Sequence, residues 1–124
     1  DWSPDGKDLV FISNVSGFFD IYKINIESRE IVRLTDSLSM DIAPSWSPDG
    51  LKILFSSNRY GTFDLFVMDS DGSNLTRLTD SEYHENYGSW SPQGSRIAYL
   101  STERGEVHLF VMNADGSRKR IVTR

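Results

Sequence analysis

A five-residue motif, Trp-Ser-Pro-Asp-Gly, recurs at a constant interval and constrains the fold of this 124-residue chain more than any other feature. It occurs at Trp2–Gly6 and Trp46–Gly50, and it returns with glutamine in place of aspartate at Trp90–Gly94. The tryptophans are 44 residues apart both times, so one unit is written three times without insertion or deletion between the motifs. A period of about 20 to 50 residues is typical of solenoids, propellers and other repeat arrays. We assign a structural role to the repeated motif positions: Trp2, Pro4, Gly6, Trp46, Pro48, Gly50, Trp90, Pro92 and Gly94.

The middle repeat predicts four short strands joined by tight turns. Ser-Pro-Asp-Gly at 47–50 favours a turn because proline presets φ and glycine accepts the positive φ that closes it. Asp71-Gly72 indicates a second turn, and residues 58–62 resemble a loop. The 3.6-residue periodicity of helical repeats is absent. The expected strands are 42–46, 52–57, 64–69 and 75–79.

The two central strands of the unit are apolar on both faces, as in Ile53-Leu54-Phe55 and Leu65-Phe66-Val67-Met68. In a sheet with one solvent-exposed face, apolar and polar residues alternate along each strand. These strands do not alternate, so both faces of each sheet must be packed against other parts of the protein. Four-stranded antiparallel sheets that cover one another are the blades of a β-propeller. We predict an all-β propeller segment, a single partial domain over 1–124, with three four-stranded antiparallel sheets of about 44 residues each: 1–40, 41–84 and 85–124.

The order of motifs within each unit resembles the WD40-like repeat of the TolB family. The motif is followed by an apolar strand ending in Ser, then Gly, then Asp-[Ile/Leu]-[Tyr/Phe], then Asp-Gly-Ser, then Arg-Leu-Thr, across the whole chain. The repeat is also similar to those in the propellers of tricorn-type and prolyl-oligopeptidase-type peptidases. The departures concern turn chemistry: Gln93 for Asp, His108 for Asp, Gly88 where another linker has Pro44, and a missing Asp-Gly turn in the first repeat.

Three blades do not close a ring, because propellers close with about 4 to 8 blades. The first repeat also lacks its innermost strand except for Asp1 and Trp2, and the chain opens on Asp1, which we interpret as a processed or truncated start. Exposed blade faces and strand edges favour association. Two explanations stay open: the chain is part of a longer propeller, or it is half of a six-bladed ring that a homodimer or another oligomer closes.

Composition excludes several classes of partner. The formal net charge is −5, and the one adjacent basic run is Arg118-Lys119-Arg120, so no nucleic-acid partner is expected. There are no cysteines, which excludes disulfides and thiolate metal sites. No apolar run approaches the roughly 20 residues of a membrane helix, so no membrane insertion is expected. No cofactor or metal is predicted, and the compartment is unknown, although the TolB resemblance implies the periplasm.

No catalytic constellation emerges from the sequence. No Gly-x-Ser-x-Gly pentapeptide is present, and His108 aligns with Asp20 and Asp64, which indicates a structural substitution. The Asp69-x-Asp71-x-Ser73 pattern has its glycine at the wrong position for a calcium loop. We expect Asp20 and Asp64 to cap backbone at the start of a strand, and the tryptophans to pack between blades.

The segments that precede the inner strands are the candidate binding region. In a propeller they enter the blade near the mouth of the central channel, and Asp41 aligns with Glu85. One interpretation is loop solubility; the other is an acidic rim that binds a basic peptide or a cation through oxygen ligands. The candidate residues are Asp41, Tyr83, His84, Glu85 and Asn86.

The TolB resemblance implies a non-catalytic scaffold for protein–protein interaction. The three-blade count adds that its ring closes by self-association or with the rest of a longer chain. Possible partners are thus a second copy, further blades, or a peptide or protein. The alternative is the gating or substrate-filtering propeller of a tricorn-like or prolyl-oligopeptidase-like peptidase whose catalytic domain is outside this chain. A third possibility is a segment that assembles without any ligand.

Overall fold

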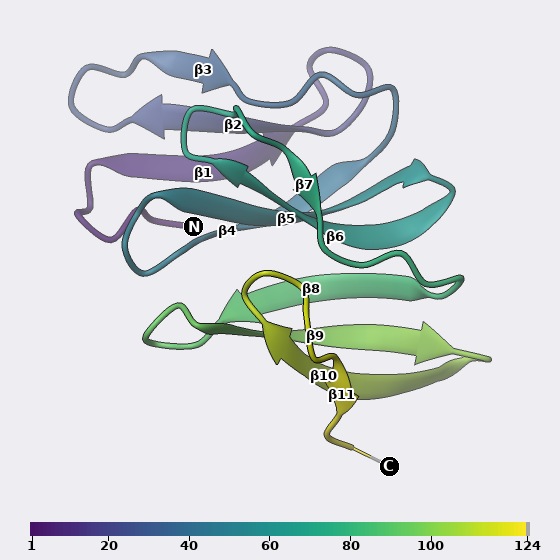
Figure 1. Cartoon of the computed structure of the whole chain (residues 1–124). Helices are drawn as coiled ribbons and strands as arrows, with labels where there is room; N and C mark the ends of the chain where they lie inside the picture. The colour runs from purple at the N-terminus through teal and green to yellow at the C-terminus, as the bar shows by residue number, and fades with distance from the viewer. Residues whose placement is uncertain (124) are drawn as a thin grey trace.

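The computed structural model describes residues 1–123, and within them it contains eleven β-strands and no helix (Figure 1). Blade 1 contains β1 (Asp8–Ser13), β2 (Asp20–Asn25) and β3 (Ile31–Arg33). Blade 2 contains β4 (Asp41–Trp46), β5 (Lys52–Tyr60), β6 (Thr62–Asp69) and β7 (Thr76–Arg77). Blade 3 contains β8 (His84–Trp90), β9 (Arg96–Glu103), β10 (Glu106–Asn113) and β11 (Arg120–Ile121).

Each blade is an antiparallel sheet whose strands lie in chain order, and the three sheets follow one another along the stack in Figure 1. The predicted all-β propeller fold is confirmed. Blades 2 and 3 have four strands, whereas blade 1 has three. The inner-strand position of blade 1 is occupied by the start of the chain, where Trp2 forms a bridge with Leu9 and Asp1 exchanges two backbone hydrogen bonds with Val10 (2.8 and 2.9 Å).

The core consists of two interblade clusters that are copies of each other. Between blades 1 and 2 the cluster contains Val10, Ile21, Leu34, Trp46, Ile53, Phe55, Phe66 and Met68. Between blades 2 and 3 it contains Leu54, Leu65, Leu78, Ile97, Tyr99 and Met112, with Val67, Trp90 and Phe110 packed against it. Members of the two clusters are related by the 44-residue period, so the repeat in sequence is a repeat of one packing interface.

The Ser-Pro-Asp-Gly turns are held by side-chain hydrogen bonds as well as by their glycines. In blade 2 the Ser47 hydroxyl donates to Asp49 (2.6 Å) and accepts from the Lys52 amide (2.9 Å), and the Leu51 amide donates to Asp49 (3.0 Å). Gly50 has a φ of +74°, which glycine adopts without strain. These hydrogen bonds lower the pKa of Asp49, the bond from the Ser47 side chain having the largest effect.

The loop expected at 58–62 is instead a paired hairpin. β5 continues to Tyr60, which pairs with Thr62, and the register shifts after Ser57. A side-chain hydrogen bond holds the segment in place: the Met40 backbone N–H donates to the side-chain oxygen of Asn58 at 2.8 Å. The loop prediction failed here because this contact comes from Met40, eighteen residues away in the linker between blades 1 and 2.

The outer strands are shorter than predicted, with β7 limited to Thr76–Arg77. After Arg77 one backbone bond remains, from the Leu78 amide to the Leu65 carbonyl at 2.8 Å, and a side chain then replaces the strand ladder: the Thr79 hydroxyl accepts from the buried Leu65 amide at 2.9 Å. The same bond joins Thr35 to Ile21 and Thr123 to Leu109. The threonine of Arg-Leu-Thr is therefore the point at which each outer strand leaves its sheet.

Asp20 and Asp64 pair with arginines rather than capping backbone, which corrects the sequence prediction. Arg33 lies 2.6 Å from the Asp20 carboxylate and Arg77 lies 2.7 Å from that of Asp64, and both carboxylates are buried. In blade 3 both partners change together, to His108 and Ile121. The paired change supports the structural interpretation of His108.

Candidate functional site

The predicted site residues lie at one end of the blades, which we call the rim end. Here β4 and β8 begin, the β5–β6 and β9–β10 hairpins turn, and Asp41 and Glu85 stand opposite Ser57 and Ser101. The Ser-Pro-Asp-Gly turns lie at the opposite end, which we call the turn end. The structure therefore brings the predicted residues of blade 3 together on one segment, Tyr83–Asn86, and places Asp41 at the equivalent point of blade 2.

Asp41 is enclosed rather than exposed. Its carboxylate is fully buried, accepts from the Ser37 hydroxyl at 2.7 Å, and lies 3.1 Å from the Arg59 guanidinium. Arg59 in turn lies over the rings of Phe55 (5.6 Å) and Phe66 (4.8 Å). Asp41 therefore balances an internal cation and does not present a free carboxylate to the rim.

Glu85 is also buried, with 5% of its surface exposed, but its Oε2 atom has no hydrogen-bond partner among residues 1–123. The side-chain oxygen of Asn86 is in the same situation. Burial raises the pKa of the nearby Tyr99 phenol, and the negative charge of Glu85 adds to that rise. Blade 3 thus contains a buried acidic position that differs chemically from that of Asp41.

His84 joins two blades. Its ring is exposed, its Nδ1 accepts from the Phe63 backbone N–H at 3.1 Å, and the two rings lie 5.8 Å apart. Through this hydrogen bond and the ring contact, His84 holds the start of blade 3 against blade 2. Tyr83 is half-buried beside it. No group of three or more His, Cys, Asp or Glu side chains in the described residues is arranged to hold a metal ion.

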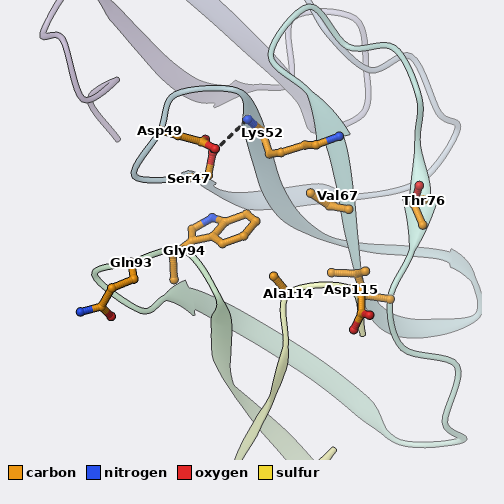
Figure 2. A pocket seen from close by; sticks show the side chains of 11 residues that line it. Ser47, Asp49, Lys52, Val67, Thr76, Gln93, Gly94, Ala114 and Asp115 are labelled. Atoms are coloured by element: carbon orange, nitrogen blue, oxygen red, sulfur yellow. Dashed lines mark hydrogen bonds between the residues drawn. The ribbon is translucent and has the colours of Figure 1, made fainter. Parts of the chain in front are cut away.

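A cavity of about 420 Å³ lies at the turn end, between blades 2 and 3 (Figure 2). Figure 2 shows Asp49, Lys52 and Val67 on one wall and Gln93 and Asp115 on the other. Sequence reasoning missed this cavity. Its full lining is Ser47, Asp49, Lys52, Val67, Thr76, Leu78, Trp90, Gln93, Gly94, Ala114 and Asp115.

One substitution between the repeats removes a side chain that crosses the equivalent groove. At the equivalent place between blades 1 and 2, Lys23 crosses the groove, donates to the Ser70 carbonyl at 2.8 Å and lies 6.0 Å from the Trp46 ring. That groove measures about 200 Å³. Val67 occupies the Lys23 position in blade 2 and is too short to cross, so the groove beside it stays open.

Comparison with known proteins agrees with this geometry. The model of the TolB β-propeller domain matches residues 1–124. The chain belongs to the TolB β-propeller family. A search of curated proteins gave no match.

Solved structures of TolB proteins share the fold closely. A TolB from Agrobacterium tumefaciens is 32% identical over 97% of this chain and 46% of its own, with a TM-score of 0.91. TolB from Acinetobacter baumannii is 26% identical over 98% of this chain and 31% of its own, with a TM-score of 0.88. The tricorn protease is 17% identical over 83% of this chain and 9% of its own, with a TM-score of 0.65, which shows the fold alone. The chain spans less than half the length of these proteins.

Neither the rim nor the cavity provides a recognisable catalytic arrangement. The carboxylates of Asp41 and Glu85 are buried in blade packing, and the cavity combines the apolar surfaces of Val67, Leu78 and Trp90 with scattered polar groups. The described part of the chain contains no helix long and apolar enough to cross a membrane.

Proposed function

We propose that this TolB-family chain is a non-catalytic protein-interaction scaffold whose open blade faces bind blade faces of the same kind, supplied by a second copy when the chain is isolated. The observation that carries the proposal is that each open face repeats one half of the interface already formed twice within the chain. Continuity with that interface supports a blade face of the same kind as the occupant.

The open face of blade 1 carries the residues equivalent to those that blade 2 buries against blade 1. Trp2, at the position of Trp46, is 55% exposed, whereas Trp46 is 7% exposed. Leu9, Phe11 and Ile24 are partly exposed at positions where Ile53, Phe55 and Met68 are buried. The equivalent set is Trp2, Leu9, Phe11, Tyr22 and Ile24.

The open face of blade 3 carries the other half. Val122 is 52% exposed, whereas its equivalents Leu34 and Leu78 are 9% and 6% exposed. Ala98 and Leu109 are partly exposed at positions where Leu54 and Leu65 are fully buried. Two copies related by a twofold axis would bring each blade 1 face against a blade 3 face and complete six blades.

The peptidase alternative has weaker support. The tricorn protease is only 17% identical in sequence to this chain, so the similarity supports a shared fold and no more. The chain's likeness to the two TolB structures is greater in both identity and TM-score. The scaffold role is therefore the function we adopt.

Substitutions on one open face test the proposal. In sedimentation equilibrium, Leu109→Arg should convert a dimer of the isolated chain to a monomer, because a charge is placed in an apolar interface. Leu38→Arg is the matched control, since Leu38 is 85% exposed in the linker between blades 1 and 2 and should leave the dimer unchanged. Equal masses for wild type, Leu109→Arg and a second open-face variant, Phe11→Arg, would contradict the proposal.

A further inference from the structure

Blade 2 contains an internal arginine site at the rim end. The Arg59 guanidinium lies 3.1 Å from the Asp41 carboxylate and donates to the Ser57 hydroxyl through Nε at 3.0 Å. The rings of Phe55 and Phe66 lie below it, stacked 5.7 Å apart at 20°. A carboxylate, a hydroxyl and an aromatic pair together recognise one guanidinium.

Blade 3 repeats the receiving groups of that site. Glu85 stands where Asp41 does, and Ser101 stands opposite it as Ser57 does in blade 2. Tyr99 and Phe110 form the aromatic pair, stacked 5.6 Å apart at 25°. The geometry of the pair is almost unchanged, so the same kind of surface is present in both blades.

The arginine itself is not repeated. Glu103 occupies the position of Arg59, and continuous pairing of β9 with β10 up to Glu103 places its side chain on the same face as Ser101. Blade 3 therefore has a second carboxylate where blade 2 has a cation. The local charge is negative where blade 2 is balanced.

The polar atoms of this set have no partners within residues 1–123. They are Oε2 of Glu85, the phenol oxygen of Tyr99 and the hydroxyl oxygen of Ser101. Their residues are 5%, 1% and 1% exposed. Burying a carboxylate without a partner is costly, and such atoms are normally satisfied in native proteins. Three unpartnered groups on one face point to a ligand that supplies donors and positive charge.

We propose that the set formed by Glu85, Tyr99, Ser101, Phe110 and Glu103 is a site for the guanidinium group of an arginine in a bound polypeptide. A guanidinium offers several donors and a flat face that rests on an aromatic ring, as Arg59 does in blade 2. A multivalent metal ion fits less well, because the described residues contain no group of three or more ionisable metal ligands. The site lies between blades 2 and 3 of one chain and does not depend on ring closure.

Ethylguanidinium and a short arginine peptide are the probes. In amide NMR titrations of the full chain, both should give saturable shifts at Glu85, Ser101 and Phe110, whereas the citrulline peptide, which is uncharged, should give none. The peptide should bind at least tenfold more tightly than ethylguanidinium if a polypeptide arginine is the natural occupant. Equal affinity would contradict that part of the proposal.

Variants supplied by the repeat provide the controls. Glu103→Arg places the blade 2 arginine in blade 3, and it should abolish probe binding and raise the melting temperature. Glu85→Gln should weaken binding at least tenfold. Arg59→Ala opens the reference site in blade 2 and should create a second set of shifts at Asp41 and Ser57. Wild-type binding that survives both blade 3 substitutions, or no saturable shift in the wild type, would overturn the proposal.

Discussion

At the scale of single residues, the repeats show which polar pairs act as units. Asp20–Arg33 and Asp64–Arg77 are ion pairs with a buried carboxylate and a partly exposed guanidinium. In blade 3 the same positions carry His108 and Ile121. Because both members change together, removal of one member should cost more than replacement of the pair.

Arg77→Ala tests this pairing. It leaves Asp64 buried without its cation, and we expect a loss of about 2 kcal/mol, which allows for the partial exposure of Arg77. Burial raises the pKa of Asp64 and Arg77 opposes that rise. A buried carboxyl with a raised pKa destabilises the folded protein as pH rises and the carboxyl ionises. The loss of folding stability caused by Arg77→Ala should therefore be smaller in acid, where Asp64 is protonated.

The double substitution Asp64→His with Arg77→Ile is the matched comparison, since it copies blade 3. Urea unfolding at pH 7 should show a smaller loss for the double variant than for Arg77→Ala alone. A double variant that loses as much stability as Arg77→Ala, or more, would show that the pair does not act as a unit.

Gln93→Asp should stabilise the third turn. In the second turn Asp49 accepts from the Ser47 hydroxyl and the Leu51 amide, which lowers its pKa. An aspartate at 93 should gain the same bonds, worth about 1 kcal/mol at pH 7. Because a lowered pKa gives stability that is lost as pH falls, the gain should be complete above the ordinary carboxyl pKa of 3.8 and should shrink as pH falls below it, through the lowered pKa of the folded state. Thermal melts at pH 7 and pH 3 measure this change, and a gain as large at pH 3 as at pH 7 would contradict the assignment of these hydrogen bonds.

At the scale of strands, the inner strands of blades 2 and 3 share a bulge but differ in the residue that faces the preceding blade. The register shifts between Ile42 and Ser45 in β4, and between Asn86 and Ser89 in β8. Blade 2 has Pro44 at the position of Gly88 in blade 3. The size of the residue on the preceding blade changes in the opposite sense. The smaller Gly88 accompanies the larger Leu54, whereas the larger Pro44 accompanies the smaller Val10, which stands at the position of Leu54.

Gly88→Ala should destabilise blade 3 by about 1–2 kcal/mol, because a Cβ there would lie 2.5 Å from a methyl group of the fully buried Leu54. Leu54→Val should relieve this contact, so the double variant should be more stable than the sum of the single changes predicts. Urea unfolding of the four proteins in a double-mutant cycle measures the coupling. Strict additivity would contradict the contact.

The elements of this fold could be predicted from sequence because the period, the apolar strands and the turn motifs are local. The hairpin at Asn58–Thr62 and the short outer strand β7 could not, since each depends on a side chain from elsewhere, Asn58 with Met40 and Thr79 with Leu65. The site was predicted only in part. The alignment of Asp41 with Glu85 was visible, but the partner of Asp41 is eighteen residues away at Arg59, and only the packed blade shows that pairing.

The cavity between blades 2 and 3 could not be predicted from the sequence for a related reason. Its size depends on Val67 standing where blade 1 has Lys23, whose ammonium crosses to the next blade. A difference in side-chain length becomes a cavity only when two blades are placed together. Residues that differ between otherwise equivalent repeats are therefore the informative positions in this chain.

At the scale of the whole molecule, three repeats form the interblade interface twice. One unpaired half of that interface is left exposed on blade 1, and the other half is left exposed on blade 3. Trp2 and Val122 mark the two faces, and both are more than half exposed at positions that are otherwise buried. Apolar faces of this kind associate in water. We therefore expect that the isolated chain does not persist as a monomer.

The solution mass of the isolated chain, measured by light scattering after size exclusion, tests this expectation most directly. We predict a single species of twice the 14.1 kDa chain mass, as expected for two three-bladed halves of one ring. A stable 14.1 kDa monomer with a cooperative unfolding transition would contradict the account, because both open faces would then be tolerated in water.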